Sequence, residues 1–245
     1  MQAKKIIAVI LSVIICFTFV SCGNTGKPTE NTSNGQADSD NSEEVITVEN
    51  LENALYNKVK GEILKWNEED IYAISFFVES NESYEYNGFQ NVTMWAISYN
   101  TEEDCDGAGN LDEERWNYAF WRQNEISIID VDTQNKYTDA LFDWYAQYGI
   151  TNIGEENENE MYDEDFNYIG KGPAGHYELL QLATSVAKKL QEDGTIKEHF
   201  GKELPIIIHG LEYAWYDIEA TQKANPNGQA KMFLKAMEEL GFVNN

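Results

Sequence analysis

The chain has 245 residues, a formal net charge of −26 and only three cysteines. With 43 acidic against 17 basic side chains, its field opposes nucleic acids and anionic lipid headgroups and favours cations or a basic protein partner. Nucleic-acid binding is therefore excluded as a function class.

The N-terminal segment has the pattern of an export signal. Lys4 and Lys5 form a short positive stretch, Ile6–Val20 is almost entirely apolar, and Ser21 precedes Cys22. An apolar stretch of about 15 residues suits export and is shorter than the roughly 20 residues of a membrane-spanning helix. The segment resembles the bacterial lipoprotein signal, which implies cleavage before Cys22 and lipidation of its thiol. The alternatives are an ordinary secretory signal and a single-pass anchor.

A polar, low-complexity stretch follows the leader and contains no aromatic residue and no Leu, Ile or Val. Such a composition buries too little apolar surface to offset the entropy of ordering the chain. The sequence predicts a signal peptide over residues 1–21, a disordered tether over 22–44 and one globular acidic domain over 45–245. Loss of Lys4 and Lys5 with the leader changes the formal charge from −26 to −28. Cys105 is then the single cysteine of the domain, so no intramolecular disulfide is expected.

The domain begins with a predicted helix over Val48–Trp66, because apolar residues recur there at every fourth position and Thr47 is suited to cap its start. Ile71–Glu79 and Val92–Tyr99 have the length and β-rich composition of core strands. The polar, Gly-containing linker Ser80–Asn91 between them suits a hairpin or a short meander, so antiparallel pairing is expected.

Further along the chain, the spacing of apolar residues and the positions of glycines predict more helices than strands. Helices are expected over Glu113–Gln123, Gln134–Tyr148, His176–Gln191, Tyr213–Ala224 and Gln229–Leu240, and strands over Ile126–Val131 and Pro205–His209. The residues of the last helix expected to face inward are Met232, Phe233, Ala236, Met237 and Leu240. The predicted fold class is α+β, with a small, mainly antiparallel sheet flanked by several helices in a single domain.

One acidic segment has nearly the spacing of an EF-hand calcium loop. Gly107 stands at position six of this loop, whereas Gly109 stands where an apolar residue is usual. The oxygen ligands would come from Glu102, Asp104, Asp106, Asn110 and Glu113. The alternative is a polar surface turn, because a chain this acidic produces such spacings by chance. A real site would bind Ca²⁺ weakly, in the millimolar range typical of extracellular modules, about 0.1 to 1 mM.

Other patterns are weaker pointers to chemistry. Gly170–Gly175 fits G-x-G-x-x-G before a helix, but it lacks a preceding strand and lies in a negative domain, so it indicates an entry loop and not a phosphate site. His209 ends a buried strand, where we expect a hydrogen-bonded structural histidine. Cys105 lies among carboxylates that should raise the pKa of its thiol and make it inert. No catalytic residue and no cofactor-binding residue are predicted.

Two further segments allow two interpretations each. Glu155–Asp165 is strongly acidic and is either a solvated loop or a surface for a basic partner. The aromatic run after Arg115 either stacks on sugars or anchors a partner, or it divides between the core and its rim, and we expect Trp116 to be part of the core.

A family resemblance rests on three segments, which are Ile71–Phe76, Asn100–Glu103 and Glu114–Trp121. Together with the N-terminal helix and the apolar run before His209, they resemble the bacterial domain-of-unknown-function 4303 family. The resemblance implies a small α+β domain, similar in character to acidic immunity proteins, and supplies no catalytic residues. The sequence thus favours an extracytoplasmic lipoprotein, held on the membrane through Cys22, that works by binding a basic protein partner. The alternatives are a calcium-dependent surface module and an envelope hydrolase.

Overall fold

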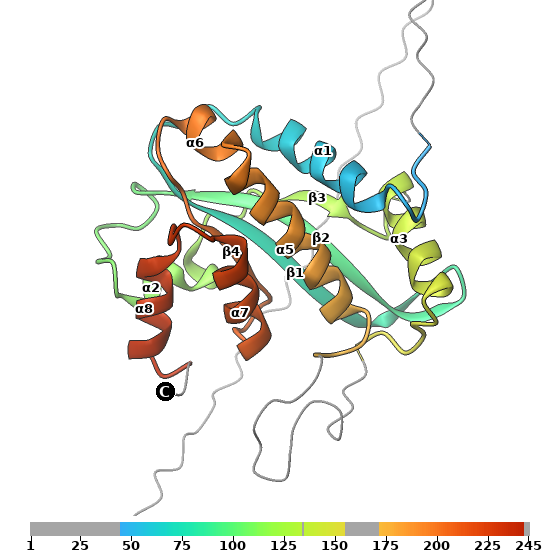
Figure 1. Ribbon diagram of the computed structural model, residues 1–245. Helices are drawn as coiled ribbons and strands as arrows, with labels where there is room; N and C mark the ends of the chain where they lie inside the picture. The colour runs from blue at the N-terminus through green and yellow to red at the C-terminus, as the bar shows by residue number, and fades with distance from the viewer. Residues whose placement is uncertain (1–44, 134, 155–171, 243–245) are drawn as a thin grey trace, which may run out of the picture. The chain divides into compact units, whose positions relative to one another are not determined.

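Two long antiparallel strands form the centre of the protein in the computed structural model, which describes residues 45–133, 135–154 and 172–242 (Figure 1). They are β1 (Ile71–Tyr86) and β2 (Phe89–Thr101). Asn87 and Gly88 connect them with φ values of 48° and 86°, as a two-residue hairpin turn with positive φ at both positions requires. The linker Ser80–Asn91 is therefore mostly strand, and the antiparallel pairing is confirmed.

Two short strands complete a four-stranded sheet in the order β3-β2-β1-β4. β3 (Ile126–Ile129) pairs antiparallel with β2, whereas β4 (Ile206–His209) pairs parallel with β1. The predicted α+β class with a mainly antiparallel sheet is confirmed. The parallel pair matters for function because it places the end of β4 beside the middle of β1.

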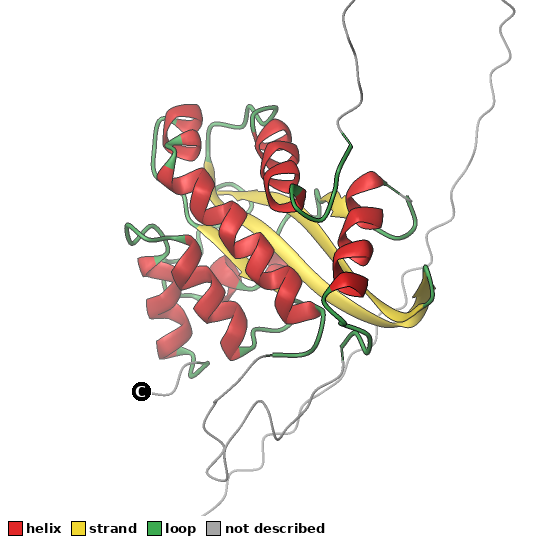
Figure 2. Ribbon diagram, turned by 45° about the vertical axis from the view of Figure 1, so that its right-hand side comes forward, coloured by secondary structure: helices red, strands yellow, loops and turns green. Residues whose placement is uncertain are grey.

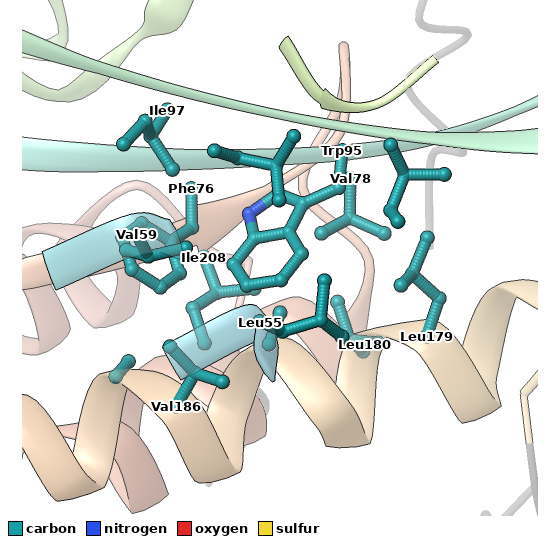
Figure 3. Packing of buried hydrophobic residues seen from close by; sticks show 14 of the residues in the cluster. Leu55, Val59, Phe76, Val78, Trp95, Ile97, Leu179, Leu180, Val186 and Ile208 are labelled. Atoms are coloured by element: carbon teal, nitrogen blue, oxygen red, sulfur yellow. The ribbon is translucent and has the colours of Figure 1, made fainter. Parts of the chain in front are cut away.

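One face of the sheet is covered by α1 (Leu51–Ile63), α3 (Lys136–Gln147) and α5 (His176–Glu192) (Figures 1 and 2). Successive side chains of a strand point to opposite faces, and alternate apolar residues of β1 and β2 point to this one. Figure 3 shows this core around the fully buried Trp95, which packs among Leu55, Val59, Phe76, Val78, Ile97, Leu179, Leu180, Val186 and Ile208.

The opposite face has a second, smaller core, which involves α2 (Glu113–Trp116), η1 (Tyr118–Phe120) and α8 (Lys231–Glu239). Its buried members include Tyr72, Ala73, Trp116, Trp121, Ile207, Phe233, Ala236 and Met237. Trp116 is 3% exposed, so its predicted place in the core is confirmed. α7 (Trp215–Ala224) contacts β4 and α5. A short helix after α5, α6 (Thr195–Phe200), was not predicted.

The start of α1 differs from the prediction. The helix begins at Leu51, and its N-cap residue is Asn50, so Thr47 does not cap it. Instead, the Thr47 N–H donates to Asn50 Oδ1 at 2.7 Å, within the turn that leads into the helix.

The predicted helix Glu113–Gln123 is broken after its first turn. Asn117 is extended, with φ −86° and ψ 117°, and its Oδ1 accepts a hydrogen bond from Ala119 N. An asparagine side chain that bonds the backbone in this way competes with helix continuation. The aromatic side chains that follow can then pack from a short η1 turn onto the second core.

The inward face of α8 is narrower than predicted. Phe233, Ala236 and Met237 are buried, whereas Met232 is 37% and Leu240 is 40% exposed. Helical periodicity identified the correct stripe, but its two flanking positions lie at the rim because one side of the helix is open to solvent.

The described domain belongs to one compact unit, Glu44–Asn245. The predicted leader and tether, the acidic loop Glu155–Asp165, and Gly170 with Lys171 lie outside the described residues. No helix in the described ranges combines the length and the apolar character that a bilayer span needs.

Candidate functional site: an acidic cleft at the end of β4

A cleft of about 360 Å³ lies where the chain leaves β4 and enters α7. Its size falls within the range of about 300 to 1,000 Å³ that is typical of ligand pockets. The lining residues are Glu79, His176, Gly210, Leu211, Glu212, Tyr213, Ala214, Tyr216 and Asp217. Three of these side chains are carboxylic acids, and none of the described lining residues is a lysine or arginine.

Asp217 is the deepest acid of the cleft, with only 2% of its surface exposed. It lies in the first turn of α7, where its Oδ2 accepts a hydrogen bond from Ala214 N at 2.8 Å, as in the reciprocal half of a capping box. Its Oδ1 is buried and has no hydrogen-bond partner in the described part of the chain. Burial raises the pKa of Asp217 to about 8, and the nearby Glu79 adds to this shift.

Glu79 approaches the cleft from β1. Its Oε2 accepts a hydrogen bond from Leu211 N at 3.0 Å, which ties β1 to the loop after β4. A Cβ at Gly210 would lie 2.9 Å from the same oxygen, so any larger residue there would displace the carboxylate. Burial raises the pKa of Glu79 as well.

His176 begins α5 and closes the third side of the cleft. It is 5% exposed, and its Nδ1 lacks a hydrogen-bond partner among the described residues. Its ring lies edge-on to Tyr216, with centroids 5.5 Å apart. Because burial lowers the pKa of His176 to about 4, the imidazole is neutral near pH 7 and one of its two ring nitrogens is an acceptor.

The rim of the cleft is partly apolar. Leu211 is 68% exposed, and Glu212 is also exposed. Tyr213 is half-buried; its hydroxyl donates to Trp116 O at 2.5 Å, which connects the rim to the second core. The cleft therefore offers acidic acceptors at its floor and apolar surface at its entrance.

His209 lies immediately before the cleft but does not line it. Its Nδ1 is 2.8 Å from Gly210 O and its Nε2 is 2.7 Å from Ser75 Oγ. Since a carbonyl only accepts, Nδ1 carries the proton and the Ser75 hydroxyl donates to Nε2. Both residues are fully buried, and the rings of Phe77 and Tyr118 pack against the imidazole. The expected hydrogen-bonded structural histidine is confirmed.

Two ligands of the predicted calcium loop, Glu102 and Asp104, are engaged by side chains of the protein. Both carboxylate oxygens of Glu102 accept from Arg115, at 2.7 and 2.8 Å. Asp104 accepts from Thr101 Oγ1 at 2.6 Å and pairs with Arg122 at 3.0 Å.

The other three ligands of that loop are spread along it. Glu113 accepts from Asn117 Nδ2 at 2.9 Å, and the backbone carbonyl of Asn110 accepts from Trp116 Nε1 at 2.8 Å. Asp106 is exposed, with φ 48°. In the described ranges no three Asp, Glu, His or Cys side chains are grouped for a metal ion, so calcium binding stays a prediction.

Cys105, in the same loop, is a free, buried cysteine. The pKa of its thiol is raised, as predicted, but burial is the largest cause and the charges of Glu102 and Asp104 are lesser ones. A thiol held in its neutral form is a poor nucleophile.

The residues that form the acidic cleft were not singled out by sequence. Glu79 and Asp217 are two acids among 43, and His176 was identified only as the start of a helix. The sequence held one signal for Asp217. An acid in the first turn of a helix can cap its start, and the aromatic residues next to Asp217 indicate that this turn is buried. The tertiary structure was needed to bring it to Glu79.

Comparison of the chain with family models, with curated proteins and with solved structures found no match. The resemblance to the domain-of-unknown-function 4303 family therefore stays a prediction.

Proposed function

We propose that the chain is an extracytoplasmic lipoprotein, anchored through Cys22, whose acidic cleft receives a basic segment of a protein partner. The predicted leader supports an extracytoplasmic location. The formal charge of −26 supports a partner of positive charge. A non-enzymatic, immunity-type role fits both features, because an acidic inhibitor on the cell surface would meet a basic toxin before the toxin reaches its target.

The observation that carries the proposal is the unpartnered Oδ1 of Asp217 in a cleft that no described lysine or arginine lines. A buried polar atom without a hydrogen bond costs about 1 to 3 kcal/mol. A cationic group from a partner would satisfy it. Long-range attraction between the acidic domain and a basic partner would also speed association and make it sensitive to salt.

The test is binding of two fluorescent peptides, octalysine and octaglutamate, to the full chain in detergent micelles. We expect octalysine to bind and octaglutamate not to bind. The affinity for octalysine should fall by about tenfold or more between about 50 and 300 mM salt, because salt screens the attraction between several pairs of charges. The double variant Glu79→Gln/Asp217→Asn should bind octalysine more weakly by about tenfold or more, as expected for the loss of close charge pairs.

The matched control is Glu85→Gln/Glu103→Gln, which makes the same change from carboxylate to amide at two exposed sites outside the cleft. It should change the affinity less than about threefold, as rim and surface charges do. Equal losses in the two double variants would show that octalysine responds only to overall charge and would refute the cleft as the binding site.

An envelope hydrolase is a second candidate, favoured by one feature of the cleft. Two acids with raised pKa values, Glu79 and Asp217, line the same cleft, and such shifts cluster at catalytic sites. Hydrolysis of purified cell-wall fragments by the full chain, lost in Glu79→Gln, would favour this candidate over pure binding.

A further inference from the structure

The three unusual polar groups of the cleft come from three different elements. Glu79 belongs to β1, His176 to the first turn of α5 and Asp217 to the first turn of α7. In the described part of the chain, no lysine or arginine forms an ion pair with any of them. They therefore surround one space in which no described side chain supplies a positive charge.

Each acid has one oxygen already engaged by the backbone. Asp217 Oδ2 accepts from Ala214 N, and Glu79 Oε2 accepts from Leu211 N. A guanidinium binds carboxylates best through a flat, two-pronged contact with both oxygens, and this contact is disfavoured here because one oxygen of each acid already accepts from the backbone. A compact ammonium instead needs single acceptors placed around it.

We propose that the cleft recognises a primary ammonium, the head of a lysine side chain of the partner, through Asp217 Oδ1, Glu79 and His176 Nδ1. An ammonium has three N–H donors and no acceptor, which matches these three groups. The exposed Leu211 and the ring of Tyr216 would contact the methylene groups of the lysine, as apolar surfaces do with such stems. The inference rests on the proposed function and specifies its ligand chemistry.

Binding of this ammonium would release a proton. The pKa of Asp217 is raised to about 8 by burial, so the free cleft holds a protonated acid at neutral pH. The groups that face it are Glu79, Glu212, Tyr213 and His176, of which none is a cation near pH 7. A lysine ammonium stays charged up to a pKa of about 10.4 and favours the ionised carboxylate. Affinity should therefore rise by up to tenfold per pH unit from pH 6 to 8 and level off above.

The experiment compares octalysine, octaarginine and fully acetylated octalysine on the full chain by titration calorimetry. At pH 7, in two buffers that differ in ionisation enthalpy, the heat of octalysine binding should report release of up to one proton. Asp217→Asn should weaken octalysine about tenfold, weaken octaarginine less than threefold, and abolish both the proton release and the pH dependence. Acetylated octalysine should not bind.

A second variant, Glu79→Gln, keeps the test valid if the Asp217→Asn protein does not fold. It should also reduce the affinity for octalysine more than the affinity for octaarginine. Equal losses for the two peptides, or no proton release, would overturn the ammonium inference while the proposed function stands. If neither octalysine nor octaarginine binds, both the ammonium inference and the proposed function are overturned. If free n-butylamine bound as tightly as octalysine, ammonium recognition would hold, and the protein partner of the proposed function would be refuted in favour of a small amine.

Discussion

The two carboxylate oxygens of Asp217 have different roles. Oδ2 caps the start of α7, whereas Oδ1 is buried without a partner among the described residues. A residue selected for stability alone would have both oxygens satisfied or would be replaced by a neutral cap. Local rules of folding are broken most often at functional sites, so this residue is the strongest single pointer to the cleft.

The protonation of Asp217 leads to a prediction about stability. Its folded pKa of about 8 lies above the ordinary value of 3.8 for an aspartate, so between these values the folded state holds a proton that the unfolded state has lost. The stabilisation from this proton is fully present below the unfolded pKa and is lost as pH rises through the folded one. The free energy of unfolding should therefore fall with pH, relative to that of Asp217→Asn, by up to about 1.4 kcal/mol per pH unit between pH 4 and 8.

Urea unfolding at pH 5, 6, 7 and 8 measures this difference. The comparison with Asp217→Asn isolates the aspartate, because His176 and His209, whose pKa values burial lowers to about 4, change stability equally in both proteins. Asp106→Asn, at an exposed site, serves as the control and should track the wild type. Parallel pH curves for wild type and Asp217→Asn would contradict a raised pKa.

At the scale of elements, α7 protects the outer edge of β4. Thr221 Oγ1 accepts from Ile208 N at 2.8 Å and is 3.1 Å from Ile208 O, while Asn225 bonds both backbone groups of Ile206, at 3.0 and 2.7 Å. Four residues of a helix rise about 6 Å and two residues of a strand about 6.6 Å, so the two spacings match. These side chains replace a neighbouring strand and close an edge that would otherwise attract one.

Asn225→Leu should reduce the free energy of unfolding by about 3 kcal/mol or more, because it leaves the N–H and C=O of Ile206 buried without partners at about 1 to 3 kcal/mol each. Urea unfolding of the full chain measures this loss. Gln222→Leu, an exposed position on the same helix, should change stability by less than about 0.5 kcal/mol. A loss no larger than in that control would show that β4 does not depend on the helix side chains.

Element types were predicted better than element ends. Periodicity identified α5 and β4 almost to the residue because each has a continuous apolar pattern. The antiparallel pairing of β1 and β2 was predicted, but the length of the two strands was not, because their outer residues are largely exposed and their polarity resembles that of a loop. The break at Asn117 depends on one side-chain bond to the backbone, which no periodic pattern reports.

For the whole molecule, the proposed lipid anchor has to be considered together with the charge. A domain with a formal charge near −28 after loss of the leader is repelled by anionic headgroups, so membrane attachment would depend on lipid alone. Two or three acyl chains give stable attachment, whereas one gives marginal, reversible binding.

Cys22→Ser should therefore convert a membrane-associated protein into one that lacks acyl mass and does not sediment with membranes. Mass spectrometry of the purified native product and fractionation of cells measure both properties. Cys16→Ser, within the predicted leader, should leave lipidation intact. Wild-type protein without an acyl group on residue 22, or found in the cytosol, would refute the proposed location.

The sequence by itself determined the acidity of the chain, the α+β class and most of its helices and strands, because charge and periodicity are local properties. Only the tertiary structure decided that Glu79, His176 and Asp217 share one cleft. The physical reason is the parallel pairing of β1 with β4, a contact between distant segments, which brings the start of α7 beside the middle of β1. Burial there, and not residue type, distinguishes Glu79 and Asp217 from the other carboxylates in the described part of the chain.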